Sequence, residues 1–255
     1  MVLERERRGR VEILTLNRPE ARNAVSPEVS EAIEAALDAL EHDREVRVVV
    51  ITGSGPVFCA GADLKVVARG EGANIETERG GFAGMVKRDF PKPIIAAVNG
   101  PALAGGFEIV LACDLVVAAD TATFGLPEAK RGLLAAAGGP IRLAKRVPMA
   151  LALEIVMTGD PIPAERAHEV GLVNEVVPAD QVVDAAVALA ERILENSPSA
   201  VRAARALVRG SIDRDEASAW ELTYELAAEL MKTGDAIEGA MAFAEKRKPV
   251  WNEEV

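Results

Sequence analysis

Residues 92–114 read KPIIAAVNGPALAGGFEIVLACD, and this stretch decides the fold class. Its apolar run from Ile94 to Val98 predicts a strand that stops at Asn99-Gly100. The small residues Ala104-Gly105-Gly106 follow and predict the start of a helix that continues to Ala112. A strand, a turn and a helix in this order are typical of an α/β protein whose function lies on the loops after its strands.

Three further segments also have the character of strands. Val11–Leu16 alternates in part, whereas Val48–Thr52 and Leu115–Ala119 are continuously apolar. Continuous apolar runs indicate strands that helices cover on both faces of a sheet. We therefore expect these strands to lie in the buried core of the α/β protein.

Helical patterns flank these strands. Ser26-Pro27 predicts an N-cap followed by a helix with one apolar face (Val29, Ile33, Ala36, Leu37, Leu40). Residues 182–194 predict a second such helix, Ser197-Pro198 opens another, and a stripe of Leu222, Leu226, Ala227 and Leu230 marks one more. We expect an α/β core over residues 1–195 and a helical region for subunit contacts over residues 196–255.

Composition excludes several classes of function. A net charge of −11 argues against a nucleic-acid partner, although local cations could still bind a small anionic ligand. Cys59 and Cys113 do not have metal-ligand or disulfide spacing. The charged start is unlike a signal peptide, and no apolar run is long enough to span a bilayer. We expect a soluble cytoplasmic protein with no membrane partner.

The turn at Ala104-Gly105-Gly106 has groups suited to chemistry. The first N–H groups of a helix have no partner within it, and the helix dipole there favours negative charge. Glu108 lies three residues beyond Gly105 and thus on the same helical face. Alternatively, the glycines only permit close packing and Glu108 only stabilises the helix dipole.

Two other segments have a similar form. Ala60-Gly61-Ala62 precedes Asp63, which is either part of a ligand-binding turn or simply an N-cap. Pro127 fixes the backbone before Glu128, which taken alone is most simply a surface glutamate. His42 and His168 lie in charged contexts typical of surface histidines, so carboxylates and backbone amides remain as the chemical groups.

The three segments together, in this order and at this spacing, resemble the crotonase (enoyl-CoA hydratase/isomerase) superfamily. The similarity extends from Val11 to Pro249, and Gly80-Gly81-Phe82-Ala83-Gly84 and Ala242–Trp251 resemble the carnitinyl-CoA dehydratase and related hydratase branch. The resemblance implies a crotonase-like spiral of ββα turns with a C-terminal helical region. It also implies a homotrimer or homohexamer.

The resemblance also implies roles for individual residues. The N–H groups of Ala62 and Gly105 would form an oxyanion hole for a thioester carbonyl, with Ala60, Leu64 and Lys65 along the CoA moiety.

Four further residues take implied roles. Glu108 would activate water and Glu128 would deliver a proton to Cα, although their order could be the reverse. Phe243 and Lys246 would contact the CoA of an adjacent subunit.

The resulting expectation is an enoyl-CoA hydratase or dehydratase that acts on an acyl-CoA thioester and needs no cofactor and no metal. A Δ3,Δ2-enoyl-CoA isomerase and a non-catalytic acyl-CoA- or RNA-binding homologue remain as alternatives. Two departures from the family pattern stand out. Ala104 replaces a common glycine, and the loop 133–139 lacks the usual proline and glycine near Ala135-Ala136, which leaves the acyl preference open.

Overall fold

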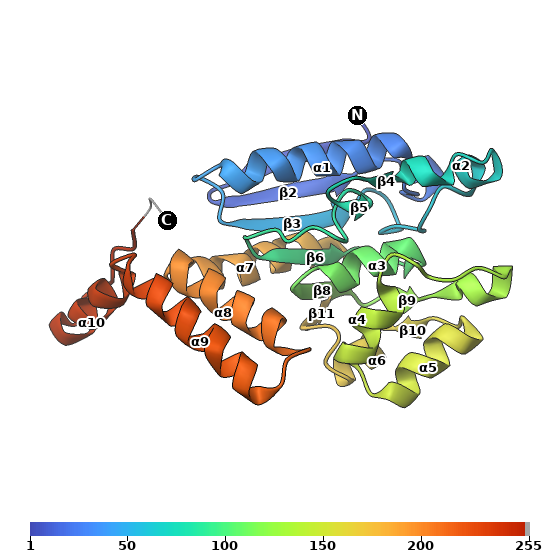
Figure 1. Ribbon diagram of the computed structural model, residues 1–255. Helices are drawn as coiled ribbons and strands as arrows, with labels where there is room; N and C mark the ends of the chain where they lie inside the picture. Colours follow the sequence, from blue (N-terminus) through green and yellow to red (C-terminus); the bar gives the residue numbers. More distant parts are fainter. Residues whose placement is uncertain (253–255) are drawn as a thin grey trace.

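The main feature of the fold is a six-stranded sheet with the order β1-β2-β3-β6-β8-β11. It is seen in the computed structural model, which describes residues 1–252 (Figure 1). β1 pairs antiparallel with β2, and the other neighbours are parallel. The bounds of the six strands are β1 Leu3–Arg8, β2 Val11–Leu16, β3 Val48–Gly53, β6 Ile94–Val98, β8 Leu115–Ala119 and β11 Glu175–Val177.

All four predicted strands are confirmed within one residue of their bounds. The sequence did not predict β1, because its residues are mostly charged. The structure explains that composition: Arg5 and Arg7 pair with Glu12 of β2, at 2.7 and 2.9 Å. Charged side chains on an edge strand also discourage pairing with other chains.

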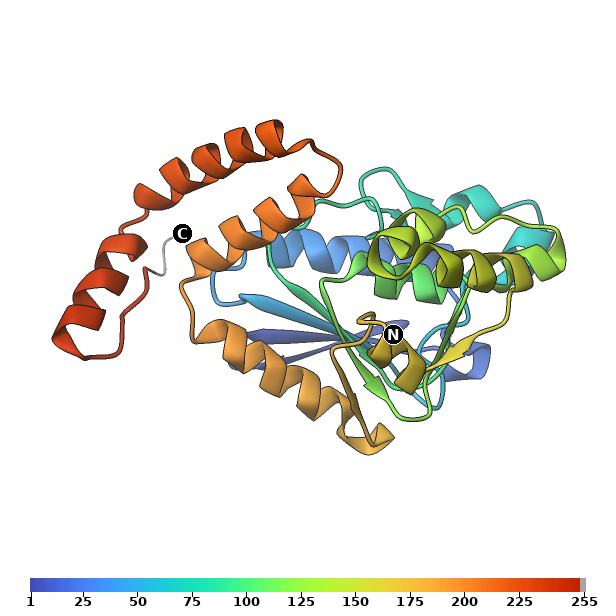
Figure 2. The ribbon, with the colours of Figure 1, turned by 90° about the horizontal axis from the view of Figure 1, so that it is seen from below.

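Helices cover both faces of this sheet (Figure 2). α1 (Pro27–His42) packs on one face and α7 (Val182–Leu194) on the other. The predicted apolar face of α1 is buried, as expected. Ser26 occupies the N-cap position, but its hydroxyl donates to Glu28 Oε2 at 2.6 Å and does not cap the helix.

A small second sheet lies beside the main one and has the order β10-β9-β7. Its strands are β7 Ala102–Leu103, β9 Thr123–Gly125 and β10 Ile162–Pro163. β7 leads into α3 (Gly105–Ala112), and β9 leads into the 3-10 turn η3 (Pro127–Arg131). The remaining elements of the core are η1 Pro19–Ala21, α2 Leu64–Ala68, η2 Gly72–Ile75, β4 Glu76–Thr77, β5 Gly81–Phe82, α4 Gly139–Arg146, α5 Met149–Thr158, α6 Ala164–Glu169 and η4 Ala179–Gln181.

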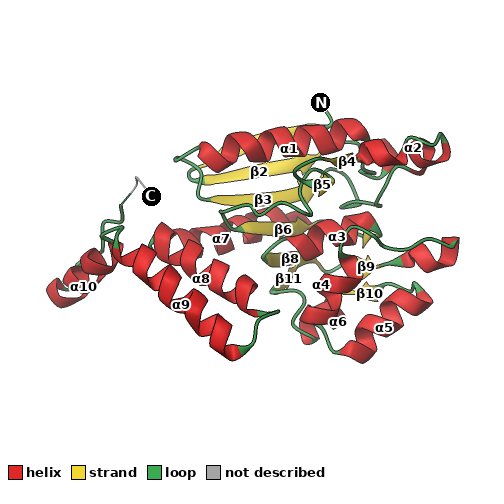
Figure 3. Ribbon diagram, viewed as in Figure 1, coloured by secondary structure: helices red, strands yellow, loops and turns green. Residues whose placement is uncertain are grey.

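The chain ends in a helical arm formed by α8 (Pro198–Ser211), α9 (Glu216–Met231) and α10 (Asp235–Glu245). This arm projects away from the sheet (Figures 1 and 3). The hydroxyl of Ser197 caps α8 by accepting from the Ala200 N–H at 3.0 Å, as Ser197-Pro198 predicted. The division between core and arm at residue 195 stays a prediction. Across residues 1–252, none of the helices combines the length and apolar character that crossing a bilayer would need.

Candidate active site

Three chain segments reach the same edge of the small sheet. Cys59 forms a parallel bridge with Ala102, which itself pairs in parallel with Phe124. The Leu103 N–H donates to Cys59 O at 3.0 Å, which fixes the register. Because parallel strands end at the same edge of a sheet, the turns at 60–62, 104–106 and 126–128 lie next to one another.

These turns surround a cavity of about 780 Å³. Its lining includes seven of the nine expected site residues: Ala60, Ala62, Leu64, Lys65, Gly105, Glu108 and Glu128. The other two, Phe243 and Lys246, are at the end of the arm, outside this lining. Phe243 is 87% exposed in the single chain. Its expected contact, with CoA of an adjacent subunit, stays a prediction.

The glycines of the turns allow a very close approach of two backbones. A Cβ atom on Gly61 would lie 2.9 Å from Gly105 N, and one on Gly106 would lie 2.1 Å from Cys59 O. The close-packing interpretation therefore holds for Gly106, and the same packing requires glycine at position 61. It also means that the 60–62 turn is in contact with the first amide of α3.

The N–H of Ala62 lies on the free edge of its segment. Ala62 forms a parallel bridge with Val25, and the bonds of this bridge use Gly61 O and Asp63 N–H. Since successive peptide groups of an extended segment point in opposite directions, the Ala62 N–H points away from Val25. This amide is thus not used by the strand pairing, and Ala62 itself lines the cavity.

The turn before α3 has an unusual backbone conformation. Ala104 has a φ of 53° and a ψ of −131°, which is a region that favours glycine. This position is therefore strained with alanine, at a typical cost of about 1–3 kcal/mol.

Glu108 is a buried acid in the first turn of α3, only 3% exposed. Burial raises the pKa of its carboxyl group, and the charge of Glu128 adds to that rise. The N–H of Gly139 donates to Glu108 Oε1 at 2.8 Å and opposes the rise by favouring the carboxylate. The charge of Glu128 thus acts on Glu108 across the cavity.

Glu128 is a half-buried acid at the start of η3, and burial raises the pKa of its carboxyl group. Its Oε2 atom is buried and has no hydrogen-bond partner among the described residues. Such an atom is available to hydrogen-bond to a water or a bound molecule, because a buried polar atom without a partner costs free energy. The interpretation of Glu128 as an ordinary surface glutamate is wrong.

Asp63 is an N-cap, which is the simpler of its two interpretations. Its carboxylate caps α2 by accepting from the Lys65 N–H at 3.1 Å and pairs with Arg18 at 3.1 Å. His42 and His168 are exposed, as expected for surface histidines.

Arg142 of α4 is a site residue that the sequence did not indicate. Its guanidinium donates to Ala137 O at 3.1 Å and to Val86 O. It therefore fixes the loop that carries the Gly139 N–H, and its charge lowers the pKa of Glu108. No sequence signal identifies this role, because Arg142 lies in a helix with other basic residues.

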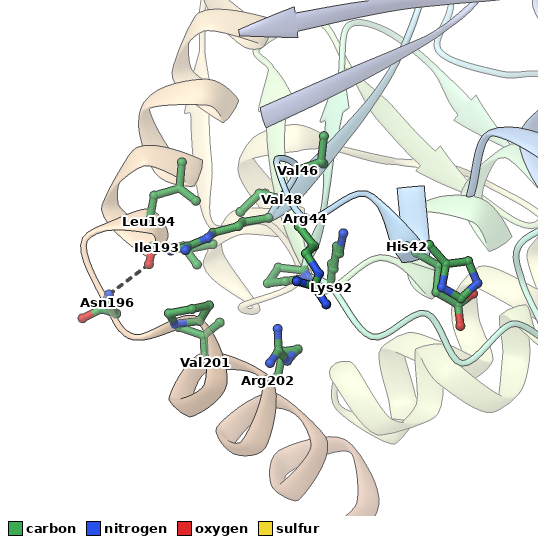
Figure 4. A pocket seen from close by; sticks show the side chains of 14 residues that line it. His42, Arg44, Val46, Val48, Lys92, Ile193, Leu194, Asn196, Val201 and Arg202 are labelled. Carbon is green, nitrogen blue, oxygen red and sulfur yellow. Dashed lines mark hydrogen bonds between the residues drawn. The ribbon is translucent and has the colours of Figure 1, made fainter. Parts of the chain in front are cut away.

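A second cavity, of about 340 Å³, lies between the end of α1 and the start of α8 (Figure 4). Its lining includes the cations Arg44, Lys92 and Arg202. The Lys92 ammonium already donates to the carbonyl oxygens of Leu40 and Asp43, at 2.5 and 2.6 Å. This cavity has neither the glycine turns nor the paired acids, so we do not assign the chemistry to it.

The comparison with known proteins decides the family. A model described as enoyl-CoA hydratase/isomerase matches residues 6–254. The chain belongs to this family.

Individual members of the enoyl-CoA hydratase/isomerase family are similar over nearly their whole length. The carnitinyl-CoA dehydratase of Proteus mirabilis (strain HI4320) is 40% identical, covering 96% of this chain and 95% of that protein. The crystal structure of enoyl-CoA hydratase from Mycobacterium tuberculosis H37Rv is 46% identical, with a TM-score of 0.94 and 99% of both chains covered. The carnitinyl-CoA hydratase structure from Mycobacterium avium is 50% identical, with a TM-score of 0.78 and 98% of both chains covered. The expected crotonase fold is thereby confirmed.

Proposed function

We propose that this protein adds water to a 2-trans-enoyl-CoA thioester to give a 3-hydroxyacyl-CoA, or catalyses the reverse dehydration. The observation that carries the proposal is a pair of acids, the buried Glu108 and the half-buried Glu128, in one cavity with the Gly105 turn. The unpartnered Oε2 of Glu128 supports it, because water or the substrate can supply the missing hydrogen bond.

In the proposed mechanism the thioester oxygen accepts hydrogen bonds from the N–H groups of Ala62 and Gly105. Addition at Cβ moves the π electrons of the double bond onto this oxygen, which becomes an enolate. Fixed main-chain donors and the N-terminus of α3 stabilise that negative charge more than they stabilise the neutral substrate. Loss of one such donor typically raises the barrier by about 3–4 kcal/mol.

The two acids move the protons. The Glu108 carboxylate takes a proton from water while the water oxygen bonds to Cβ. The carboxylic acid of Glu128 then gives its proton to Cα as the enolate collapses. Burial raises the pKa of both carboxyl groups, which favours the neutral acid that this reaction needs at one of them, and the order of the two roles could be the reverse.

We also assign the CoA moiety to the mouth of the cavity, along Ala60, Leu64 and Lys65. Phe243 and Lys246 would reach it from an adjacent subunit. The catalytic steps are supplied by backbone amides and carboxylates, so the proposed reaction uses no cofactor and no metal.

The proposed assembly is a homotrimer or homohexamer formed through the helical arm. Its support is the exposure of α9, which buries none of its residues, and of large apolar side chains along the arm (Val208, Ile212, Trp220, Tyr224, Met231, Ile237, Met241, Phe243). Light scattering of the purified protein should give a mass of three or six chains, and Trp220→Glu should reduce it while the exposed-site control Lys232→Glu should not. A wild-type protein that stays monomeric at micromolar concentration would refute this assembly.

We extend the proposal to a cytoplasmic location, which the two free and buried cysteines support. The net charge of −11 disfavours an RNA-binding role. A Δ3,Δ2-enoyl-CoA isomerase is also disfavoured, since that reaction needs one principal acid/base and this cavity has two.

One assay separates these functions. The purified protein is offered a 2-enoyl-CoA and, separately, a 3-enoyl-CoA, and the absorbance of the conjugated thioester is followed. Hydration removes that absorbance from the first substrate, whereas isomerisation creates it from the second. The assay is repeated after dialysis against EDTA, which should leave the rate unchanged. Absence of any change with a panel of 2-enoyl-CoA esters would refute the proposal.

A further inference from the structure

Phe82 is the only aromatic residue among the described residues that line the active-site cavity, and the proposed mechanism does not use it. It belongs to the Gly80–Gly84 motif and is 8% exposed. A Cβ atom on Gly105 would lie 2.4 Å from Phe82 Cζ and 2.6 Å from its Cε1. The edge of the ring therefore packs directly on the residue whose N–H is the proposed oxyanion donor.

The backbone on either side of Phe82 has an unusual conformation that fixes the position of the ring. Gly81, Ala83 and Gly84 all have positive φ angles, of 66°, 55° and 64°. Ala83 is fully buried, and its conformation is costly for a residue that has a Cβ atom. A Cβ on Gly80 would lie 2.0 Å from Gly84 O, so the motif closes tightly on itself. Such strain persists only where the surrounding structure holds it in place.

Helix α1 supplies that support. Glu34 Oε2 accepts hydrogen bonds from the Gly80 N–H at 2.7 Å and from the Thr77 hydroxyl at 2.5 Å. Arg88, just beyond the motif, pairs with Asp38 at 2.7 Å. The hairpin formed by β4 and β5 is thus fastened to a helix that covers the main sheet, and the ring has little freedom to move aside.

We propose that Phe82 is a specificity-determining residue whose ring limits the width of the acyl group next to the thioester. The inference rests on the proposed function, because Gly105 N–H must hold the thioester oxygen. In that arrangement the carbonyl carbon lies near Gly105 and carries two substituents, the thioester sulfur and Cα. The sulfur leads to the CoA moiety along Ala60, Leu64 and Lys65, so we place a substituent on Cα against the ring. The enzyme therefore favours 2-enoyl thioesters that are unbranched at Cα.

The test compares 2-butenoyl-CoA with 2-methyl-2-butenoyl-CoA, using kcat/KM for wild type, Phe82→Leu and Phe82→Ala. The kcat/KM for the branched substrate relative to that for the unbranched one should rise about 10-fold or more in Phe82→Ala. The reason is that one methyl group in an apolar pocket typically changes kcat/KM by about 10–200-fold. Phe82→Leu should give a smaller rise. Met85→Ala is the matched control, because Met85 is buried in the same segment and does not line the cavity.

Each outcome has a definite meaning. An unchanged ratio in a Phe82→Ala protein with a near-native melting temperature overturns the inference, as does an equal rise in Met85→Ala. If Phe82→Ala does not fold, Phe82→Leu decides by the same criterion. A wild type that hydrates the branched thioester as fast as the unbranched one also overturns it. A wild type that hydrates neither of these thioesters nor any other 2-enoyl-CoA ester of the panel instead refutes the proposed function.

Discussion

The backbone N–H of Gly139 donates to Oε1 of Glu108 over 2.8 Å, and position 139 has no room for a side chain. A Cβ atom there would lie 2.8 Å from Glu108 Cγ and 2.9 Å from Oε1. The loop and the acid therefore fit together as a unit. Gly139 therefore orients the carboxylate through its N–H and, by lacking a Cβ atom, leaves room for the Glu108 side chain.

Gly139→Ala should displace Glu108 and lower kcat/KM by at least about 100-fold, the lower end of the contribution of a positioned acid or base. Gly72→Ala is the matched control, because its new Cβ would meet Val67 Cγ2 at an ordinary 3.6 Å. Steady-state hydration rates and melting curves measure the effect. Near-native turnover in a folded Gly139→Ala protein would contradict the role of this contact.

Glu108→Gln and Glu128→Gln should each slow hydration by about 10²–10⁴-fold, because each removes a proton-transfer group and keeps its shape. The affinity for a 3-hydroxyacyl-CoA should change little, since the amide donors remain. Stopped-flow rates and calorimetric binding separate the two effects. If either variant keeps the wild-type rate, that glutamate has no part in proton transfer.

Arg142→Met should move the acidic limb of the pH profile of kcat/KM to higher pH. The guanidinium lowers the pKa of Glu108, so its removal raises that pKa, and the base then loses its proton only at higher pH. Arg142→Lys keeps the positive charge, so its acidic limb should shift less than that of Arg142→Met.

The control for this experiment is Lys145→Met on the same helix, whose ammonium pairs with the exposed Asp213. A purely structural role for Arg142 would lower activity equally at every pH. A profile with an unshifted limb therefore excludes the electrostatic role.

Ala104→Gly should stabilise the protein, because glycine relieves the positive φ of this position. The strain is typically about 1–3 kcal/mol, whereas the extra freedom of glycine in the unfolded chain costs about 0.4–1 kcal/mol. A net gain of about 1 kcal/mol would raise the melting temperature by about 2–4 °C in a chain of this size. Calorimetry at one fixed protein concentration measures it, and a lower melting temperature would show that the Ala104 methyl contributes more by packing than it costs.

The sequence predicted the central strands because continuous apolar runs such as Ile94–Val98 have few alternatives in an α/β protein. It did not reveal the small sheet, since β7 has two residues and β9 has three, too few for a periodic pattern. This sheet is nevertheless what brings the turns of the site together. The grouping of the acids came instead from the resemblance to a family.

Two contacts of the site could not be predicted for a related reason. Arg142 acts through Val86 O, a carbonyl 56 residues away in the chain. Phe82 acts through its contact with Gly105, which depends on how the β4–β5 hairpin lies against α1. Both contacts depend on tertiary packing, which local sequence patterns do not predict.

In the proposed mechanism main-chain N–H groups bind the thioester oxygen, whereas side chains transfer the protons. Any residue but proline at position 62 keeps the N–H there, so ordinary mutation can hardly erase it. The acids at positions 108 and 128 can each be lost by a single codon change. A scaffold of this kind can exchange one reaction for another during evolution while it continues to recognise the same class of activated acyl group.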